Sequence, residues 1–188
     1  MIELQKSLAM SLSPQDAAAV LRDIEQTQSR SAILHEYQHA APHFIIWGII
    51  WIVGYGLSDF FPTREYAIWA ALVPVGLVAG AFIQSGGSRA IAWRYGATSL
   101  AVFVFFFAAF FVMSPVSGRQ VAAFIPLLVA LIYVLRGIWG APRYVVAGIV
   151  VAVLTLVGFV WLKPHFFLWM AVVGGGALIL AGLWMRRV

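Results

Sequence analysis

The sequence predicts an all-α membrane protein whose bundle consists of six transmembrane helices. Of the 188 residues, 63% are hydrophobic and 10% are charged, and the mean hydropathy is +0.94. This composition is typical of polytopic membrane proteins. Between Phe44 and Met185 the chain runs as six long apolar stretches, with the charged residues at or near their ends. Charged side chains are costly in hydrocarbon, so this placement also indicates lipid as the surroundings.

Residues 1–41 are predicted to be a cytoplasmic segment that contains an amphipathic helix. Ser13, Pro14 and Asp16 have the residue types of an N-cap, a first-turn proline and an acidic N3 position. Val20, Leu21 and Ile24 then form a narrow apolar stripe at helical spacing. The opposite face mixes positive and negative charges, whereas a helix on a membrane surface carries mostly Lys and Arg.

We therefore expect Val20, Leu21 and Ile24 to be a partner-binding face. Its partner would be the protein's own loops 85–94 and 137–143, a second copy in a homo-oligomer, or a soluble cytoplasmic regulator.

The same segment contains a match to the H-E-x-x-H pattern of zinc metalloproteases, from His35 to His39. On a helix the two imidazoles share one face, and Glu36 is the candidate catalytic base. His43 is the candidate third ligand, but it lies about 12 Å from His35 along a continuous helix, so one ion reaches both only if the chain breaks at Pro42. We therefore expect a structural role for these histidines, and no cofactor; a zinc site or a pH or metal sensor at His35, His39 and His43 stays an alternative.

Residues 42–188 are predicted to form the six-helix bundle, as three sequential hairpins. The spans are placed near 43–60, 66–84, 95–114, 120–136, 144–162 and 166–185. Each has roughly the twenty residues that are needed to cross about 30 Å of hydrocarbon at 1.5 Å per residue. Seven arginines fall on the side of the two termini, against three basic residues opposite: Arg30, Arg89, Arg94, Arg136, Arg143, Arg186 and Arg187, against Arg64, Arg119 and Lys163. This asymmetry predicts cytoplasmic amino and carboxyl termini.

The second, fourth and sixth spans each contain a helix breaker near mid-membrane. These are Pro74, Pro126 and the run Gly174, Gly175, Gly176. The second and sixth spans also align at an offset of one hundred residues, which suggests a repeated hairpin. Breakers at matching positions either allow close helix packing or line a transport path. Packing is favoured because the spans contain no ionisable residue at depth, and Gln84, Thr98, Ser99, Tyr133 and Thr155 would line only a neutral path.

Three stretches carry a family resemblance: residues 13–30, residues 42–56 and the closing residues 182–187. With them the chain resembles a group of uncharacterised small six-helix bacterial inner-membrane proteins, whose genes often lie near winged-helix regulators. The resemblance implies a location in the bacterial inner membrane and a transcription factor as the membrane protein's partner. It brings no catalytic motif.

Three functions remain open from the sequence. The first is a non-catalytic scaffold, sensor or regulatory partner that acts through the amino-terminal helix. The second is a transporter or channel for a small neutral or hydrophobic solute, and the third is a zinc-dependent membrane protease. Direct nucleic-acid binding is not expected despite the net charge of +5, because the basic residues are dispersed at helix ends.

Overall fold

The computed structural model describes residues 14–85 and 89–187, and in these ranges every regular element is a helix. Six helices there are long and apolar enough to cross a membrane. The predicted fold class, an all-α polytopic protein, is confirmed. Ser13, the predicted N-cap, lies outside the described residues, as does part of the predicted loop 85–94.

The six spans are built from these elements in chain order. They are α2 (Pro14–Phe60), η1 (Pro62–Arg64), α3 (Glu65–Ser85), α4 (Arg89–Met113), α5 (Gly118–Ile138), α6 (Pro142–Trp161), η2 (Lys163–His165), α7 (Phe166–Trp169), the π-helical turn η3 (Met170–Gly174) and α8 (Gly175–Arg186). η2, α7, η3 and α8 follow one another directly and together make the sixth span, Lys163–Arg186.

The first helix differs from the prediction, because the amphipathic segment and the first span form one helix with Pro42 inside it. Proline removes a single backbone donor, and a long helix tolerates this loss where the remaining hydrogen bonds persist. The chain divides after Glu36 into two compact units. In the first unit, residues 18–32 of α2 are exposed; the second unit begins at Tyr37 and contains the bundle.

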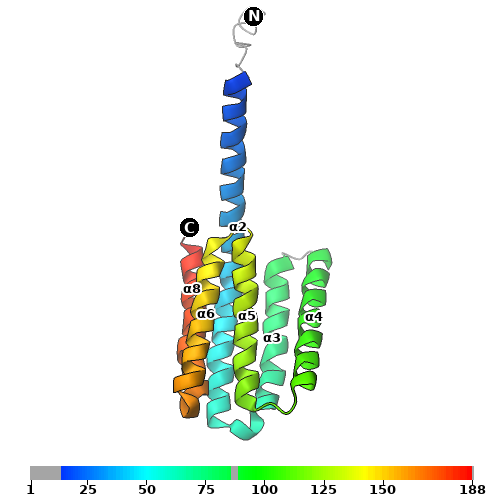
Figure 1. Cartoon of the computed structure of the whole chain (residues 1–188). Coiled ribbons are helices and arrows are strands. Elements are labelled where there is room, and N and C mark those ends of the chain that lie inside the picture. Colours follow the sequence, from blue (N-terminus) through cyan, green and yellow to red (C-terminus); the bar gives the residue numbers. More distant parts are fainter. Residues whose placement is uncertain (1–13, 86–88, 188) are drawn as a thin grey trace, which may run out of the picture. The chain divides into compact units, whose positions relative to one another are not determined.

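Within the second unit, α5 and α6 pack closely along their lengths, and α6 also contacts η3 and α8. α4 contacts mainly α3 and lies at the edge of the bundle (Figure 1). The buried apolar side chains all lie between residues 37 and 55 or between 122 and 185. The buried apolar side chains of the described bundle therefore come from α2 and α5 to α8; α3 contributes the buried glycines Gly76 and Gly80, and Gly96–Met113 of α4 contain no buried residue.

Glycines allow the backbones of α2 and the sixth span to pack in direct contact. A Cβ atom on Gly175 would lie 2.6 Å from Ile52 Cγ1 and 2.8 Å from the carbonyl oxygen of Gly48. Two turns further along, a Cβ on Gly182 would lie 2.9 Å from the carbonyl oxygen of Ala41. Small residues at such spacing are typical of membrane helix interfaces, where close backbone contact replaces the hydrophobic effect.

A hydrogen bond from α2 compensates for the proline in α5. Pro126 has no N–H, so the carbonyl of Ala122, four residues earlier, loses its helical donor. The hydroxyl of Tyr55 donates to that oxygen at 2.7 Å, and both Tyr55 and Pro126 are fully buried. The broken helical bond is thus replaced by a tertiary bond, which satisfies the carbonyl inside the membrane.

Arg143, at the start of α6, connects α6 to α2 and α8 at one end of the bundle. Its backbone N–H donates to the hydroxyl of Tyr37 at 3.1 Å, and its Nη1 donates to the carbonyl oxygen of Trp184 at 2.9 Å. The guanidinium also stacks on both rings, 5.3 Å from the centre of Tyr37 and 4.8 Å from that of Trp184. Tyr37, Arg143 and Trp184 therefore lie at the same end of the bundle, which we call the Arg143 end.

Candidate ligand cavity

A cavity of about 290 Å³ lies between α4 and the helices α2, α3 and α5. Most of its surface is apolar, and aromatic side chains contribute from α2 and α4: Trp47, Trp51, Phe103 and Phe106. Val73 and Leu77 of α3, Ile125 of α5 and Leu178 of α8 are among the aliphatic residues that complete it. The size falls at the lower limit of small-molecule sites, which are mostly apolar with few polar groups.

The polar groups of the cavity gather toward the Arg143 end. His43, Thr98, Ser99 and Tyr133 each lie 14 to 17 residues from the opposite end of their helix. Phe106 and Ile125, in contrast, lie seven residues from that opposite end. At 1.5 Å per residue the lining therefore covers about 15 Å of depth. One end offers hydrogen bonds and the other offers only apolar contact.

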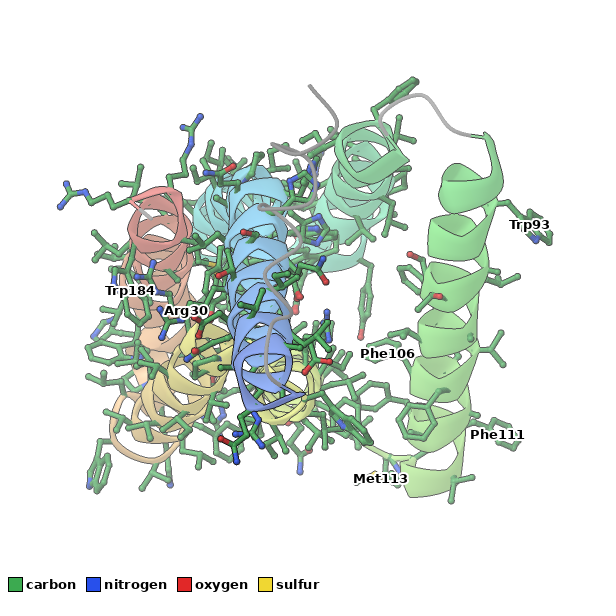
Figure 2. All side chains as sticks on the ribbon, turned by 90° about the horizontal axis from the view of Figure 1, so that it is seen from above. Arg30, Trp93, Phe106, Phe111, Met113 and Trp184 are labelled. Atoms are coloured by element: carbon green, nitrogen blue, oxygen red, sulfur yellow. The ribbon has the colours of Figure 1, made fainter. Side chains whose placement is uncertain are left out.

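α4 forms the loosely packed wall of this cavity. No residue from Gly96 to Met113 is buried. Figure 2 shows Phe106 directed from α4 toward the other helices, while Trp93 and Phe111 point away. The ring of Phe110 lies 4.5 Å from that of Phe106 and 5.2 Å from that of Phe124 on α5. α4 is therefore held to α5 by a few aromatic contacts, and most of its surface is free for lipid.

The lining residues that the structure describes include no Asp, Glu, Lys or Arg. A charged ligand would lose its hydration without gaining a partner of opposite charge, which is strongly unfavourable. The hydroxyls of Thr98, Ser99 and Tyr133 and the imidazole of His43 suit a carbonyl or hydroxyl group instead. The cavity is therefore chemically matched to a neutral molecule with one polar end.

The candidate metal ligands are distributed along α2. His35 and Glu36 belong to the first unit and His39 is exposed, whereas His43 lines the cavity. The break at Pro42 that would bring His43 toward His35 does not occur, because α2 stays helical through Pro42. In residues 14–85 and 89–187 there is no group of three or more His, Asp or Glu side chains that could hold a metal ion.

The helix breakers have three different surroundings. Pro126 is buried and compensated by Tyr55, and Gly175 lies against α2. A Cβ on Gly174 would meet the flexible end of Met170 at 3.0 Å, and one on Gly176 would meet nothing within 4 Å. Pro74 is exposed.

Two of the breakers adjoin the cavity. Val73 and Leu77, on α3 near Pro74, line the cavity, as does Ile125, next to Pro126. The π-helical turn Met170–Gly174 has no counterpart in α3, so the second and sixth spans differ locally. The repeat of hairpins stays a prediction.

The apolar stripe of the first unit is open in the single chain. Val20 is 49% exposed, Leu21 60% and Ile24 46%. An exposed stripe is compatible with a partner that is absent from a single chain, and the partner-binding role stays a prediction.

Three of the five polar residues predicted to line a path do line the cavity: Thr98, Ser99 and Tyr133. The hydroxyl of Thr155 instead donates to the carbonyl of Val151 on its own helix. The side chain of Gln84 lies outside the described part of the structure. The aromatic walls were missed. The four-residue spacing of Trp47 and Trp51, which places both on one face of α2, was the available indication.

Comparison with known proteins adds no further assignment. No family model, no curated protein and no solved structure matches the chain.

Proposed function

We propose that this multi-pass membrane protein is a non-catalytic sensor that binds a small neutral or amphipathic molecule from the bilayer. The cavity between α4 and α2, α3 and α5 supports this proposal above all. Its polar end would bind a carbonyl or hydroxyl group, and its aromatic end would hold the apolar part of the same molecule.

The amino-terminal helix is the proposed output of the sensor. His43, Trp47 and Trp51 of the cavity lie on the same continuous helix as Val20, Leu21 and Ile24. A ligand that changes the position of α2 would therefore act on the partner-binding face through the backbone of one helix. The proposed partner is a soluble cytoplasmic regulator or a second copy of the chain.

Extraction of small molecules from the purified protein tests the binding site. The full chain, purified from native membrane, should yield an enriched neutral lipid-soluble compound on mass spectrometry. Val102→Trp should reduce its amount strongly by filling the cavity, whereas Val104→Trp, on an exposed part of α4 outside the lining, should not. Equal recovery from both variants would refute the site.

A transporter for a small neutral or hydrophobic solute is the second candidate, favoured because the cavity reaches residues beside Pro74 and Pro126. The chain contains no cysteine, so single cysteines report access cleanly. A transport path predicts that a water-soluble thiol reagent labels both Ser99→Cys and Phe106→Cys. A site reached only from lipid predicts labelling of neither, or of Ser99→Cys alone.

The proposed location is the bacterial inner membrane, with both termini in the cytoplasm. Tyr37 and Trp184 share one end of the bundle, as an even number of spans requires, and the arginine asymmetry favours a cytoplasmic location for that end. Reporter fusions after Val188 and within loop 59–65 should label opposite sides of the membrane. Labelling on the same side would contradict this topology.

A further inference from the structure

A second hollow of about 280 Å³ lies on the other side of the bundle core, between α6 and α8. The hollow arises because both helices have small side chains there: Ala147 on α6, and Ala177 and Ala181 on α8. Trp184 closes one end, and the partly exposed side chains of Val146 and Leu180 form the rims. We call this hollow the α6–α8 groove. In a membrane an apolar groove with such rims is open to lipid tails.

The groove begins at the Arg143 end and runs toward the middle of the bundle. From Trp184 to Ala177 it covers seven residues of α8, about 10 Å at 1.5 Å per residue. The hydrocarbon of one leaflet is about 15 Å thick, half of the total. The groove therefore has the depth at which the upper part of an acyl chain lies.

An arginine continues each wall of the groove beyond its apolar end. Arg143 precedes Val146 by three residues on α6, and Arg187, the residue directly after the end of α8, follows Trp184 by three. The position of Arg143 is fixed, since its guanidinium stacks on the ring of Trp184 at 4.8 Å and binds the carbonyl of Trp184. Two positive charges thus lie at the mouth of an apolar groove.

The helices that line the groove contain no acidic residue. The sequence contains no Asp or Glu from Tyr66 to Val188, so α4, α5, α6 and α8 contribute none. Arginine binds phosphate oxygens through two parallel hydrogen bonds, and basic pockets between membrane helices attract anionic headgroups.

We propose that the α6–α8 groove is a binding site for an anionic phospholipid. One acyl chain lies over Ala147, Ala177 and Ala181, and the phosphate group is bound by Arg143 and Arg187. The site is separate from the cavity between α4 and α2, with no lining residue in common.

Native mass spectrometry of the full chain, exchanged into phosphatidylglycerol or phosphatidylcholine with identical acyl chains, tests the proposal. The parent protein should retain phosphatidylglycerol in preference to phosphatidylcholine. Arg187→Gln should lower retention of phosphatidylglycerol about tenfold or more, the effect of losing a charge-assisted hydrogen bond to the phosphate. Arg186→Gln removes the same charge from a position off the groove-facing side, and it should have little effect.

A second pair of variants tests the apolar part. Ala181→Phe should fill the groove and abolish the retained lipid, while Val153→Phe, at an exposed position of α6 outside the lining, should leave it bound. If Arg187→Gln and Arg186→Gln lower lipid retention equally, the effect depends on net charge alone, and the proposed site is wrong. Equal retention of both lipids by the parent protein, or full retention by Ala181→Phe, would also overturn it.

Discussion

The hydrogen bond between Tyr55 and the carbonyl of Ala122 should matter only because Pro126 is present. Tyr55→Phe keeps the ring, which packs at 5.8 Å from Trp51 and 4.9 Å from Trp69, and removes only the hydroxyl. The carbonyl of Ala122 is then left in a buried site without a donor. Such a loss costs about 1 to 3 kcal/mol, so the free energy of unfolding should fall by that amount.

Pro126→Ala supplies the missing donor and serves as the matched background. The N–H at position 126 bonds to the Ala122 carbonyl within α5, so removal of the Tyr55 hydroxyl leaves no unsatisfied oxygen. In this background Tyr55→Phe should cost less than about 1 kcal/mol, the net value of an ordinary hydrogen bond. Pro126→Ala has its own cost, because it leaves a void where a fully buried ring was, but the double-mutant cycle removes that term.

The four variants are compared by reversible unfolding in mixed detergent, with the parent protein as reference. The expected coupling energy is about 1 to 2 kcal/mol, the difference between the two costs of Tyr55→Phe. If Tyr55→Phe costs the same with proline and with alanine at position 126, the compensation argument is wrong, because the contribution of the Tyr55 hydroxyl then does not depend on the donor that Pro126 lacks.

Three further predictions follow from the helix contacts and from the amino-terminal unit. Gly175→Ala should lower the free energy of unfolding by about 1 to 3 kcal/mol, since the added Cβ would meet the backbone of α2. Gly176→Ala should be neutral or slightly stabilising, and equal effects of the two variants on thermal unfolding would refute the close contact. Leu21→Ser combined with Ile24→Ser should release any bound partner and increase proteolysis near Arg22 and Arg30 with the bundle still folded; unchanged proteolysis and partner content would make this part of α2 a solvated leader. The purified protein should contain no stoichiometric zinc by elemental analysis; zinc that is lost in His39→Ala, or a proteolytic activity lost in Glu36→Gln, would instead establish the metalloprotease.

Composition and the spacing of charges were sufficient to predict the six spans, because both report directly on transfer into lipid. The predicted boundary between residues 41 and 42 lies beside Pro42, but α2 stays helical through this proline, with Ala41 and Phe44 buried on either side of it. The packing of Trp69 on Gly54 and of Trp169 on Gly158 depends on tertiary contacts in the same way, since glycine leaves room for an indole within the bundle.

The cavity could not be predicted, because it depends on which faces of α4 and α5 meet. Six apolar helices of similar composition carry almost no periodic pattern that distinguishes a lipid-facing side from a protein-facing side. Thr98, Ser99 and Tyr133 were visible as polar residues in the spans, yet their place beside one cavity follows from the packing of Phe106 and Phe110 of α4 against Phe124 of α5. Pairings of this kind depend on three-dimensional packing that spacing along one helix does not contain.

The two hollows differ in how their walls are held, and this difference supports separate roles. The α6–α8 groove lies on helices that contribute buried core residues, and one of its end residues, Trp184, is bound by Arg143. A lipid there would meet a preformed surface and would stabilise the existing arrangement. The cavity beside α4 has one wall without a buried residue, and a weakly packed helix moves at lower cost than a core helix. Ligand binding there can therefore shift α4, and the proposed sensor requires that this shift be passed to α2 through His43, Trp47 and Trp51 in the same cavity, whereas the groove is suited to a structural lipid.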